Sequence, residues 1–258
     1  MRLPDKPRVL WIDLICIDQN NTDERGHQVG IMCRIYGTTS QNLVWLGPYD
    51  DIISESINAM EVMLQEVAIE ARDYADFGKF PFENDRFQRF SKDRLSNTVD
   101  CLALLRLLDN PWFTRLWIVQ GASLAPSSMC HYGKFKVPLD KVLRLAAWLH
   151  HKWYRIPEIP QSIAPRLNNA ASLFSLTDKE HGVFHTTVGD SAMVNLLRQY
   201  GLMQTFDRRD RVFAILGLWQ MLTKAPVLPN ILRPNYDSSV CEVFKISTRY
   251  AIDESNHL

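Results

Sequence analysis

The chain has 258 residues, of which 46% are hydrophobic and 22% are charged, as in ordinary globular proteins. Its 29 Lys and Arg balance 29 Asp and Glu, so the formal net charge is zero and no bulk attraction for nucleic acid is expected. No apolar run approaches the roughly 20 residues of a membrane-spanning helix, and the first residues lack the apolar stretch of a secretory signal. We therefore expect a cytoplasmic protein without a membrane span.

The cysteines give no support for a structural disulfide or metal site. There are five, an odd number, and none forms a C-x-x-C pair. A disulfide framework and a tetrahedral zinc site are both disfavoured, and a reducing compartment is the simpler interpretation. The five positions are Cys16, Cys33, Cys101, Cys130 and Cys241.

The first 46 residues show the pattern of a strand, a helix and a second strand. Residues 8–16 are almost continuously apolar, which is typical of a strand covered on both faces. A helix is predicted from about Asn21, which would cap it, with Glu24 in capping-box spacing, and it would end near Gly37. Residues 43–46 form a second short apolar run. This βαβ arrangement predicts a parallel sheet.

The middle of the chain adds helices and a hairpin. Residues 116–119 are too short a run to distinguish a strand from the start of a helix. The other predictions are helices at 53–67, 99–108 and 139–150, a loop at 77–93, and a hairpin of 129–132 with 135–137.

Three prolines within residues 156–165 leave little that continues a helix, so we place a boundary there. This divides the chain into an α/β domain over 1–155, a Pro-rich linker over 156–165 and a C-terminal region over 166–258. That last region is predicted to be mostly helical, with helices at 193–200, 210–218 and 240–252.

The common catalytic signatures are absent, including G-x-G-x-x-G, the P-loop, G-x-S-x-G and H-E-x-x-H. Asp13 and Asp18 bracket the carboxyl end of the first predicted strand, where open parallel sheets place their ligand crevices, and Glu24 adds a third carboxylate. The alternative is that the two aspartates accept backbone hydrogen bonds at a turn while Glu24 completes a helix cap. Arg25 is expected to pair with Asp13 or Asp18.

A second cluster of aromatic and polar residues lies in the middle of the chain. It contains Trp112, Phe113, Arg115, Trp117 and Gln120. A hydrophobic corner in which the arginine satisfies helix-end carbonyls and the wall of a binding pocket both account for it.

Several blocks together resemble the HET (heterokaryon incompatibility) domain of filamentous fungi. Residues 10–19 read LWIDLICIDQ and residues 111–120 read PWFTRLWIVQ, and residues 207–218 and 234–237 are similar to the segment that commonly follows such a domain. The residues that carry the resemblance are Trp11, Asp13, Cys16, Gln19, Glu24, Arg25, Gln28, Tyr36, Trp45, Gly47, Trp112, Phe113, Arg115, Trp117 and Gln120.

The resemblance implies a fungal intracellular protein of nonself recognition and regulated cell-death signalling. It also implies a distant similarity to TIR domains, which are flavodoxin-like α/β folds that assemble and sometimes cleave NAD. The expected fold is therefore α/β, with an incomplete TIR-like or flavodoxin-like parallel sheet and flanking helices, followed by the mostly helical C-terminal region.

Two departures from the family pattern bear on function. A strand block that usually opens the domain is not seen here, so a sheet edge or face is expected to be left for residues 1–7 or a partner chain to cover. In the family Gln120 is normally followed by a glutamate, and TIR enzymes place a catalytic glutamate in a similar helix, whereas this chain has Gly121. Loss of one such electrostatic group lowers turnover by about 10²–10³.

Three hypotheses follow. The first is a catalytically degenerate module that acts by self-association or by binding a protein partner, with no cofactor. The second is an NAD-cleaving enzyme that uses Glu24, Asp13 or Asp18. The third is an inactive truncated paralogue. No catalytic residue is assigned, and the pocket candidates are Asp13, Asp18, Glu24, Arg115 and Gln120.

Overall fold

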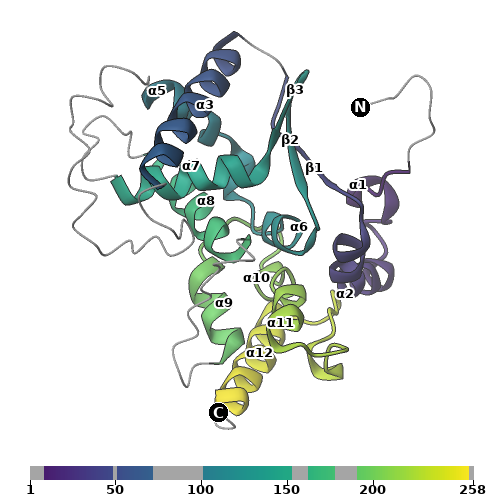
Figure 1. The fold of residues 1–258 in the computed structure, drawn as a ribbon. Coiled ribbons are helices and arrows are strands. Elements are labelled where there is room, and N and C mark those ends of the chain that lie inside the picture. The colour runs from purple at the N-terminus through teal and green to yellow at the C-terminus, as the bar shows by residue number, and fades with distance from the viewer. Residues whose placement is uncertain (1–8, 49–50, 72–100, 153–161, 178–190, 256–258) are drawn as a thin grey trace.

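The computed structural model describes residues 9–48, 51–71, 101–152, 162–177 and 191–255 (Figure 1). The loop expected at 77–93, residues 1–7 and most of the linker lie outside these ranges. The elements in chain order are α1 (Asp13–Cys16), α2 (Thr22–Thr38), β1 (Asn42–Trp45), α3 (Asp51–Ala71), α5 (Cys101–Leu108), η3 (Pro111–Thr114), α6 (Ile118–Leu124), β2 (Ser128–Tyr132), β3 (Phe135–Pro138), α7 (Leu139–Lys152), α8 (Ala164–Thr177), α9 (Ala192–Tyr200), α10 (Asp210–Phe213), α11 (Leu216–Thr223), η5 (Asn230–Leu232) and α12 (Val240–Ser255).

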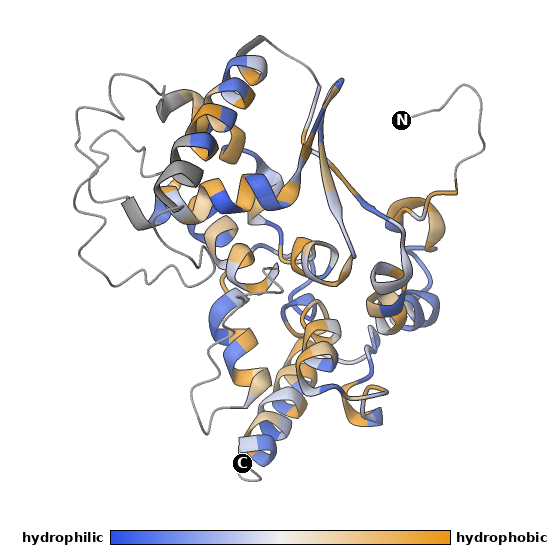
Figure 2. Ribbon diagram, viewed as in Figure 1, coloured by the Kyte–Doolittle hydropathy of each residue, from blue (hydrophilic) through white to orange (hydrophobic). Residues whose placement is uncertain are grey.

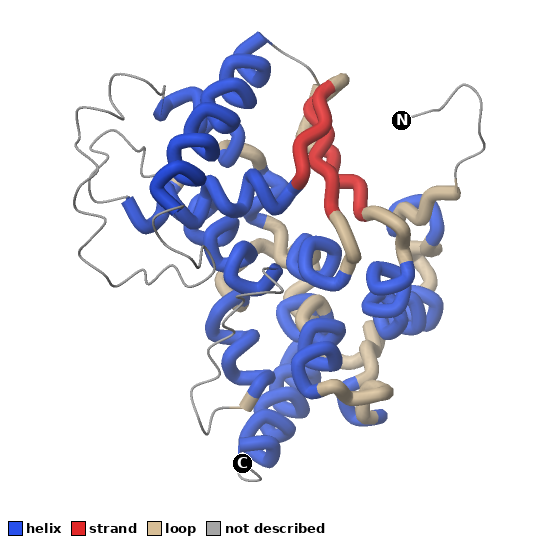
Figure 3. Tube along the Cα trace, viewed as in Figure 1, coloured by secondary structure: helices blue, strands red, loops and turns tan. Residues whose placement is uncertain are grey.

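The described strands form one small mixed sheet in the order β1-β2-β3 (Figure 3). β1 runs parallel to β2, with Val44 opposite Cys130, and β2 pairs antiparallel with β3. Gly133 has a φ of 55° in the tight turn between β2 and β3, a backbone conformation that favours glycine. The predicted second strand and the predicted hairpin are therefore confirmed.

The predicted first strand is wrong. Within residues 8–16, Asp13–Cys16 forms the one-turn helix α1, and residues 9–12 belong to no strand. Side chains expected in the core are largely exposed: 97% for Val9, 77% for Leu14 and 76% for Ile15. The turn is stabilised locally, because the amide N–H groups of residues 15 and 16 both donate to the carbonyl of Ile12. A strand needs a neighbouring ladder, and within the described ranges this segment pairs with no strand.

Helix α2 confirms the predicted N-cap but modifies the capping box. The side-chain oxygen of Asn21 accepts hydrogen bonds from the amides of Asp23 and Glu24, each at 3.1 Å. The Glu24 carboxylate accepts from the amide of Asp18, also at 3.1 Å, instead of from the cap residue itself. The side chain at the third helical position thus ties the preceding loop to the helix start.

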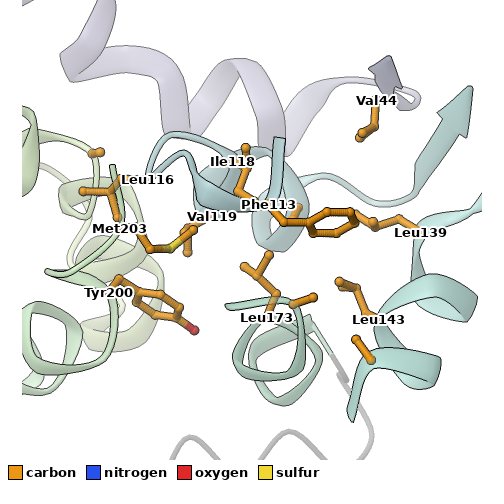
Figure 4. Packing of buried hydrophobic residues seen from close by; sticks show 14 of the residues in the cluster. Val44, Phe113, Leu116, Ile118, Val119, Leu139, Leu143, Leu173, Tyr200 and Met203 are labelled. Carbon is orange, nitrogen blue, oxygen red and sulfur yellow. The ribbon is translucent and has the colours of Figure 1, made fainter. Parts of the chain in front are cut away.

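Helix α7 packs on β2 and β3, and α3 and α8 pack on α7, so one part of the core lies between the sheet and these helices (Figure 3). The predicted helices at 53–67, 99–108 and 139–150 correspond to α3, α5 and α7. Figure 4 shows Phe113 at the centre of this packing, between Val44 of the sheet and Leu173 of α8. The same hydrophobic cluster continues to Tyr200 of α9, so α/β and helical parts share one core.

The C-terminal region is mostly helical, as predicted, and the fold class is mixed α/β. The helix predicted at 210–218 is two helices, α10 and α11, separated at Ala214 and Ile215. Residues 116–119, left open by the sequence, lead into α6. Helix α11 packs against α2 and α6, which brings the C-terminal region onto the N-terminal one.

Candidate functional site

The three acidic candidates are occupied by backbone hydrogen bonds. Asp13 is exposed and accepts from the amide of Leu14 at 2.8 Å, and Asp18 is exposed and accepts from the amide of Asn20 at 3.0 Å. Glu24 accepts from the amide of Asp18, so each of the three carboxylates supports a local turn. For Asp13 and Asp18 this is the turn arrangement of the alternative, whereas Glu24 accepts from the amide of Asp18 and not from that of the cap residue Asn21.

Arg115 and Gln120, the other two candidates, lie in different environments. Arg115 is exposed, and its main chain forms an isolated bridge with Gln204. Gln120 is buried on α6, and its side-chain amide donates to the carbonyl of Ala214 at 2.8 Å. Its oxygen Oε1 would lie only 2.6 Å from a Cβ at Gly217 of α11. Gln120 therefore fastens α6 to the C-terminal region.

The N-terminal segment contacts helix α2 at Tyr36. The rings of Trp11 and Tyr36 are in edge-on contact, with centroids 6.1 Å apart. The pKa of Tyr36 is raised to about 12, chiefly by burial and also by the charge of Asp13, while the charge of Arg115 acts in the opposite direction. The charges of Asp13 and Arg115 thus act on the same phenol with opposite effects on its pKa.

Gly121 lies in the same contact. A Cβ at this position would be 3.1 Å from Cε1 of Tyr36 and 3.3 Å from the side-chain nitrogen of Asn42. That amide also donates to the carbonyl of Gly121 at 3.1 Å, tying α6 to β1. Both neighbours must shift by a few tenths of an ångström for any side chain at position 121.

The densest group of charged contacts in the described residues is a cluster that the sequence did not predict. We call Arg25, Asp207, Arg209, Asp210 and Tyr236 the charge cluster. Arg25 of α2 does not pair with Asp13 or Asp18 as expected. Its Nη2 lies 3.1 Å from Asp207 Oδ2 and 4.0 Å from Asp210 Oδ1. Arg25 pairs with these distant aspartates because the C-terminal region packs against α2.

Asp207 is held by two arginines. Arg209 donates through Nε to Oδ1 at 3.0 Å and through Nη2 to Oδ2 at 2.8 Å, a two-pronged contact. The same guanidinium donates to the carbonyls of Tyr236 and Ser238. Hydrogen bonding from Arg209, chiefly, lowers the pKa of Asp207 to about 2, against the opposing effect of burial. Asp207 is therefore ionised over the physiological range.

Asp210, at the start of α10, is only 6% exposed. Its carboxylate accepts from the indole Nε1 of Trp117 at 3.0 Å and from the hydroxyl of Tyr236 at 2.6 Å. Burial raises the pKa of Asp210, and the two hydrogen bonds act in the opposite direction. The charge cluster thus joins the aromatic block at Trp117 to α2 and to the segment after η5.

The charge cluster has a structural role, because neither of its two carboxylates is free to act as a nucleophile or a base. Each carboxylate oxygen of Asp207 and Asp210 has a donor within hydrogen-bond distance. The sequence does contain a signal for the charge cluster. Residues 207–211 are charged and directly precede a strongly apolar stretch, and charged side chains beside a core are normally paired.

No helix in the ranges described is long and apolar enough to cross a bilayer. Those same ranges contain no group of three His, Cys, Asp or Glu placed to hold a metal ion. The four cysteines that can be described, Cys16, Cys33, Cys130 and Cys241, are free thiols.

Comparison with known proteins finds one family that matches the N-terminal part of the chain. Residues 1–121 match the family model described as heterokaryon incompatibility protein (HET). These residues form a HET domain. The matched residues end at Gly121 within α6, next to Gln120, while Asp207 and Asp210 lie beyond them. The charge cluster therefore connects the HET domain to the region that follows it.

A curated relative supports the match. The chain is 27% identical over 155 residues to "Heterokaryon incompatibility protein 6, OR allele" of Neurospora crassa. That alignment covers 54% of this chain and 22% of the relative, so the chain spans about a fifth of that protein's length. No solved structure matches the chain.

Proposed function

We propose that this chain is a nonself-recognition module of filamentous fungi that acts in heterokaryon incompatibility and cell-death signalling by protein association, without turning over a substrate. The HET match and the Neurospora relative support the biological role. The proposed mechanism is supported by the exposed apolar side chains near the N-terminus and by the glycine at position 121, where the resemblance calls for a glutamate.

One observation carries the association. The side chains of Val9, Leu10, Ile12, Leu14 and Ile15 are apolar and exposed, and we call them the N-terminal apolar surface. Figure 2 shows this stretch as hydrophobic colour at the periphery of the molecule around α1. Contiguous exposed apolar side chains commonly mark protein interaction sites. The half-exposed Trp45 of β1 adds an aromatic at the edge of the sheet.

Two observations speak against turnover. At position 121, where the resemblance calls for a glutamate, the chain has a glycine packed against Tyr36. Asp13, Asp18 and Glu24, the carboxylates of the NAD-cleaving alternative, each accept a hydrogen bond from a backbone amide. No cofactor is therefore part of this proposal.

Association is tested by measuring molar mass in solution from low to high micromolar concentration. The wild type is expected to form dimers or larger species, and the double variant Leu14→Glu, Ile15→Glu is expected to stay monomeric because two carboxylates interrupt the apolar surface. Leu202→Glu with Phe206→Glu changes two exposed apolar residues between α9 and α10 and serves as the control. A folded wild type that remains monomeric at high micromolar concentration contradicts the proposal.

Turnover is tested separately by incubating the protein with NAD and measuring nicotinamide release. No release is expected from the wild type. Release that disappears in Glu24→Gln would establish the enzyme instead. Gly121→Glu, with Gly121→Ala as the matched control for crowding Tyr36, asks whether restoring the carboxylate creates activity, as expected of a domain that has lost it.

A further inference from the structure

A cleft of about 410 Å³ lies between α2 and the segment from residue 226 to 234. Gln220 of α11 forms part of its floor, where the Cys33 thiol donates to Gln220 Oε1 at 3.3 Å. The volume falls in the range of about 300–1,000 Å³ that is typical of small-molecule sites. None of the five pocket candidates of the sequence lines it.

The lining combines basic groups with an apolar wall. His27, Arg34 and Arg233 contribute the basic side chains, and no Asp or Glu of the described ranges lines the cleft. Ile31, Val227 and Leu228 contribute apolar surface. A concave apolar surface with a few convergent polar groups is the usual construction of a ligand site.

The two arginines of this cleft are unlike those of the charge cluster nearby. Arg25 and Arg209 are neutralised by Asp207, whereas Arg34 and Arg233 take part in none of the ion pairs found in the described ranges. The chain has as many Asp and Glu as Lys and Arg, so a shortage of carboxylates does not explain why these two arginines lack an ion pair within the described ranges. Like charges gathered around one hollow repel each other and attract an anion.

We propose that this cleft binds a small organic anion, an apolar body bearing a phosphate or carboxylate group. The guanidinium groups of Arg34 and Arg233 bind the anionic group, since their planar forks match both phosphate and carboxylate oxygens. The apolar body lies against Ile31, Val227 and Leu228. A ligand in this position touches both α2 of the HET domain and the C-terminal region, so it stabilises their contact. The inference is independent of the proposed association.

Three probes with one ring system separate the contributions. Binding of 1-naphthyl phosphate, 1-naphthoate and 1-naphthol is measured by calorimetry with the full chain. At least one of the two anions is expected to bind saturably, about tenfold or more tightly than the neutral naphthol, and its affinity is expected to fall as salt is added. The stronger anion identifies the ligand as a phosphate ester or a carboxylate. Equal binding of naphthol, or no saturable binding of either anion, overturns the proposal.

Variants locate the binding in the cleft. Val227 is exposed, so Val227→Glu introduces a carboxylate without disturbing the core, and Val227→Gln is its matched neutral control. Val227→Glu is expected to weaken binding of the anion about tenfold, and Val227→Gln about twofold or less. The double variant Arg34→Gln, Arg233→Gln is expected to abolish the preference for the anion over naphthol, whereas Arg249→Gln on α12 leaves it unchanged. Unaltered binding by Val227→Glu, or equal weakening by Arg249→Gln, overturns the proposal. Circular dichroism and the unfolding midpoint confirm that each variant is folded.

Discussion

The guanidinium carbon of Arg25 lies 3.5 Å from the centre of the Tyr236 ring. One residue comes from α2 of the HET domain and the other from the segment before α12, so a cation–π contact joins the domain to the region after it. The hydroxyl of the same tyrosine donates to Asp210, and the guanidinium pairs with Asp207. The charge cluster is therefore a brace between two parts of the chain that are distant in sequence.

The approach of α2 to the C-terminal segment requires glycine at position 26. A Cβ there would lie 2.7 Å from the main-chain oxygen of Pro234, which cannot move aside like a flexible side chain. We expect Gly26→Ala to lower the free energy of unfolding by about 1–3 kcal/mol, as overpacking commonly does. Gly37→Ala in the same helix has open space around its Cβ and is expected to be neutral or stabilising by up to about 1 kcal/mol. Urea unfolding of both variants is the measurement, and equal effects would contradict the close contact.

Removal of the indole donor at position 117 tests the bond to buried Asp210. Trp117→Phe keeps an aromatic ring but leaves one carboxylate oxygen without its partner at 3.0 Å. We expect a loss of about 1–3 kcal/mol in thermal or urea unfolding, the usual penalty for an unsatisfied buried group. Trp11→Phe is the matched control, since among the described residues Trp11 makes an edge-on contact with Tyr36 and no indole hydrogen bond. If Trp11→Phe destabilises as much as Trp117→Phe, the hydrogen bond is not the cause.

Asp207 predicts a loss of stability in acid. Its pKa is lowered from 3.8 to about 2 on folding, so its contribution is present above the unfolded value and is lost as the pH falls from about 4 to about 2. The contribution is about 2 kcal/mol, because one pKa unit corresponds to about 1.4 kcal/mol. Asp207→Asn is expected to unfold more readily at neutral pH and to lose less stability than the wild type over that acid range.

Asp210 acts with the opposite sign. Its pKa is raised by burial, so its titration favours the folded state at low pH and ceases to do so as the pH rises through the folded value. Asp207→Asn removes one of the charges that raise the pKa of Asp210, so this opposing effect is smaller in the variant than in the wild type. Identical acid limbs for the two proteins would show that Asp207 is not held by the arginines.

Sequence alone predicted the elements whose signals are local. The cap at Asn21, the turn at Gly133 and the nearly all-apolar helix α5 each depend on neighbouring residues, and all three are present. The strand predicted at 8–16 failed because its apolar, strand-forming residues require a partner strand. Within the described ranges this segment pairs with no strand, and β1 pairs only with β2; Asp13 instead caps the amide of Leu14 in a one-turn helix.

The candidate site shows the same division. One of the two stated alternatives had Asp13 and Asp18 serving a turn, as the structure shows, and Glu24 completing the cap, whereas Glu24 bonds the amide of Asp18. The partner of Arg25 was not predictable, because Asp207 is far away in the sequence and its proximity depends on α11 packing against α2. Residues 207–218 were recognised as similar to the segment that follows HET domains, but a resemblance gives no pairwise contacts.

The most direct test of the brace is a double-mutant cycle between Arg25 and Asp207. Arg25→Met, Asp207→Asn and the double variant are unfolded with urea at neutral pH, and the coupling free energy is taken from the four stabilities. The brace predicts a favourable coupling of about 0.5–3 kcal/mol and a single cooperative transition in the wild type. Additive effects of the two changes, or separate transitions for the HET domain and the helices after it, would contradict it.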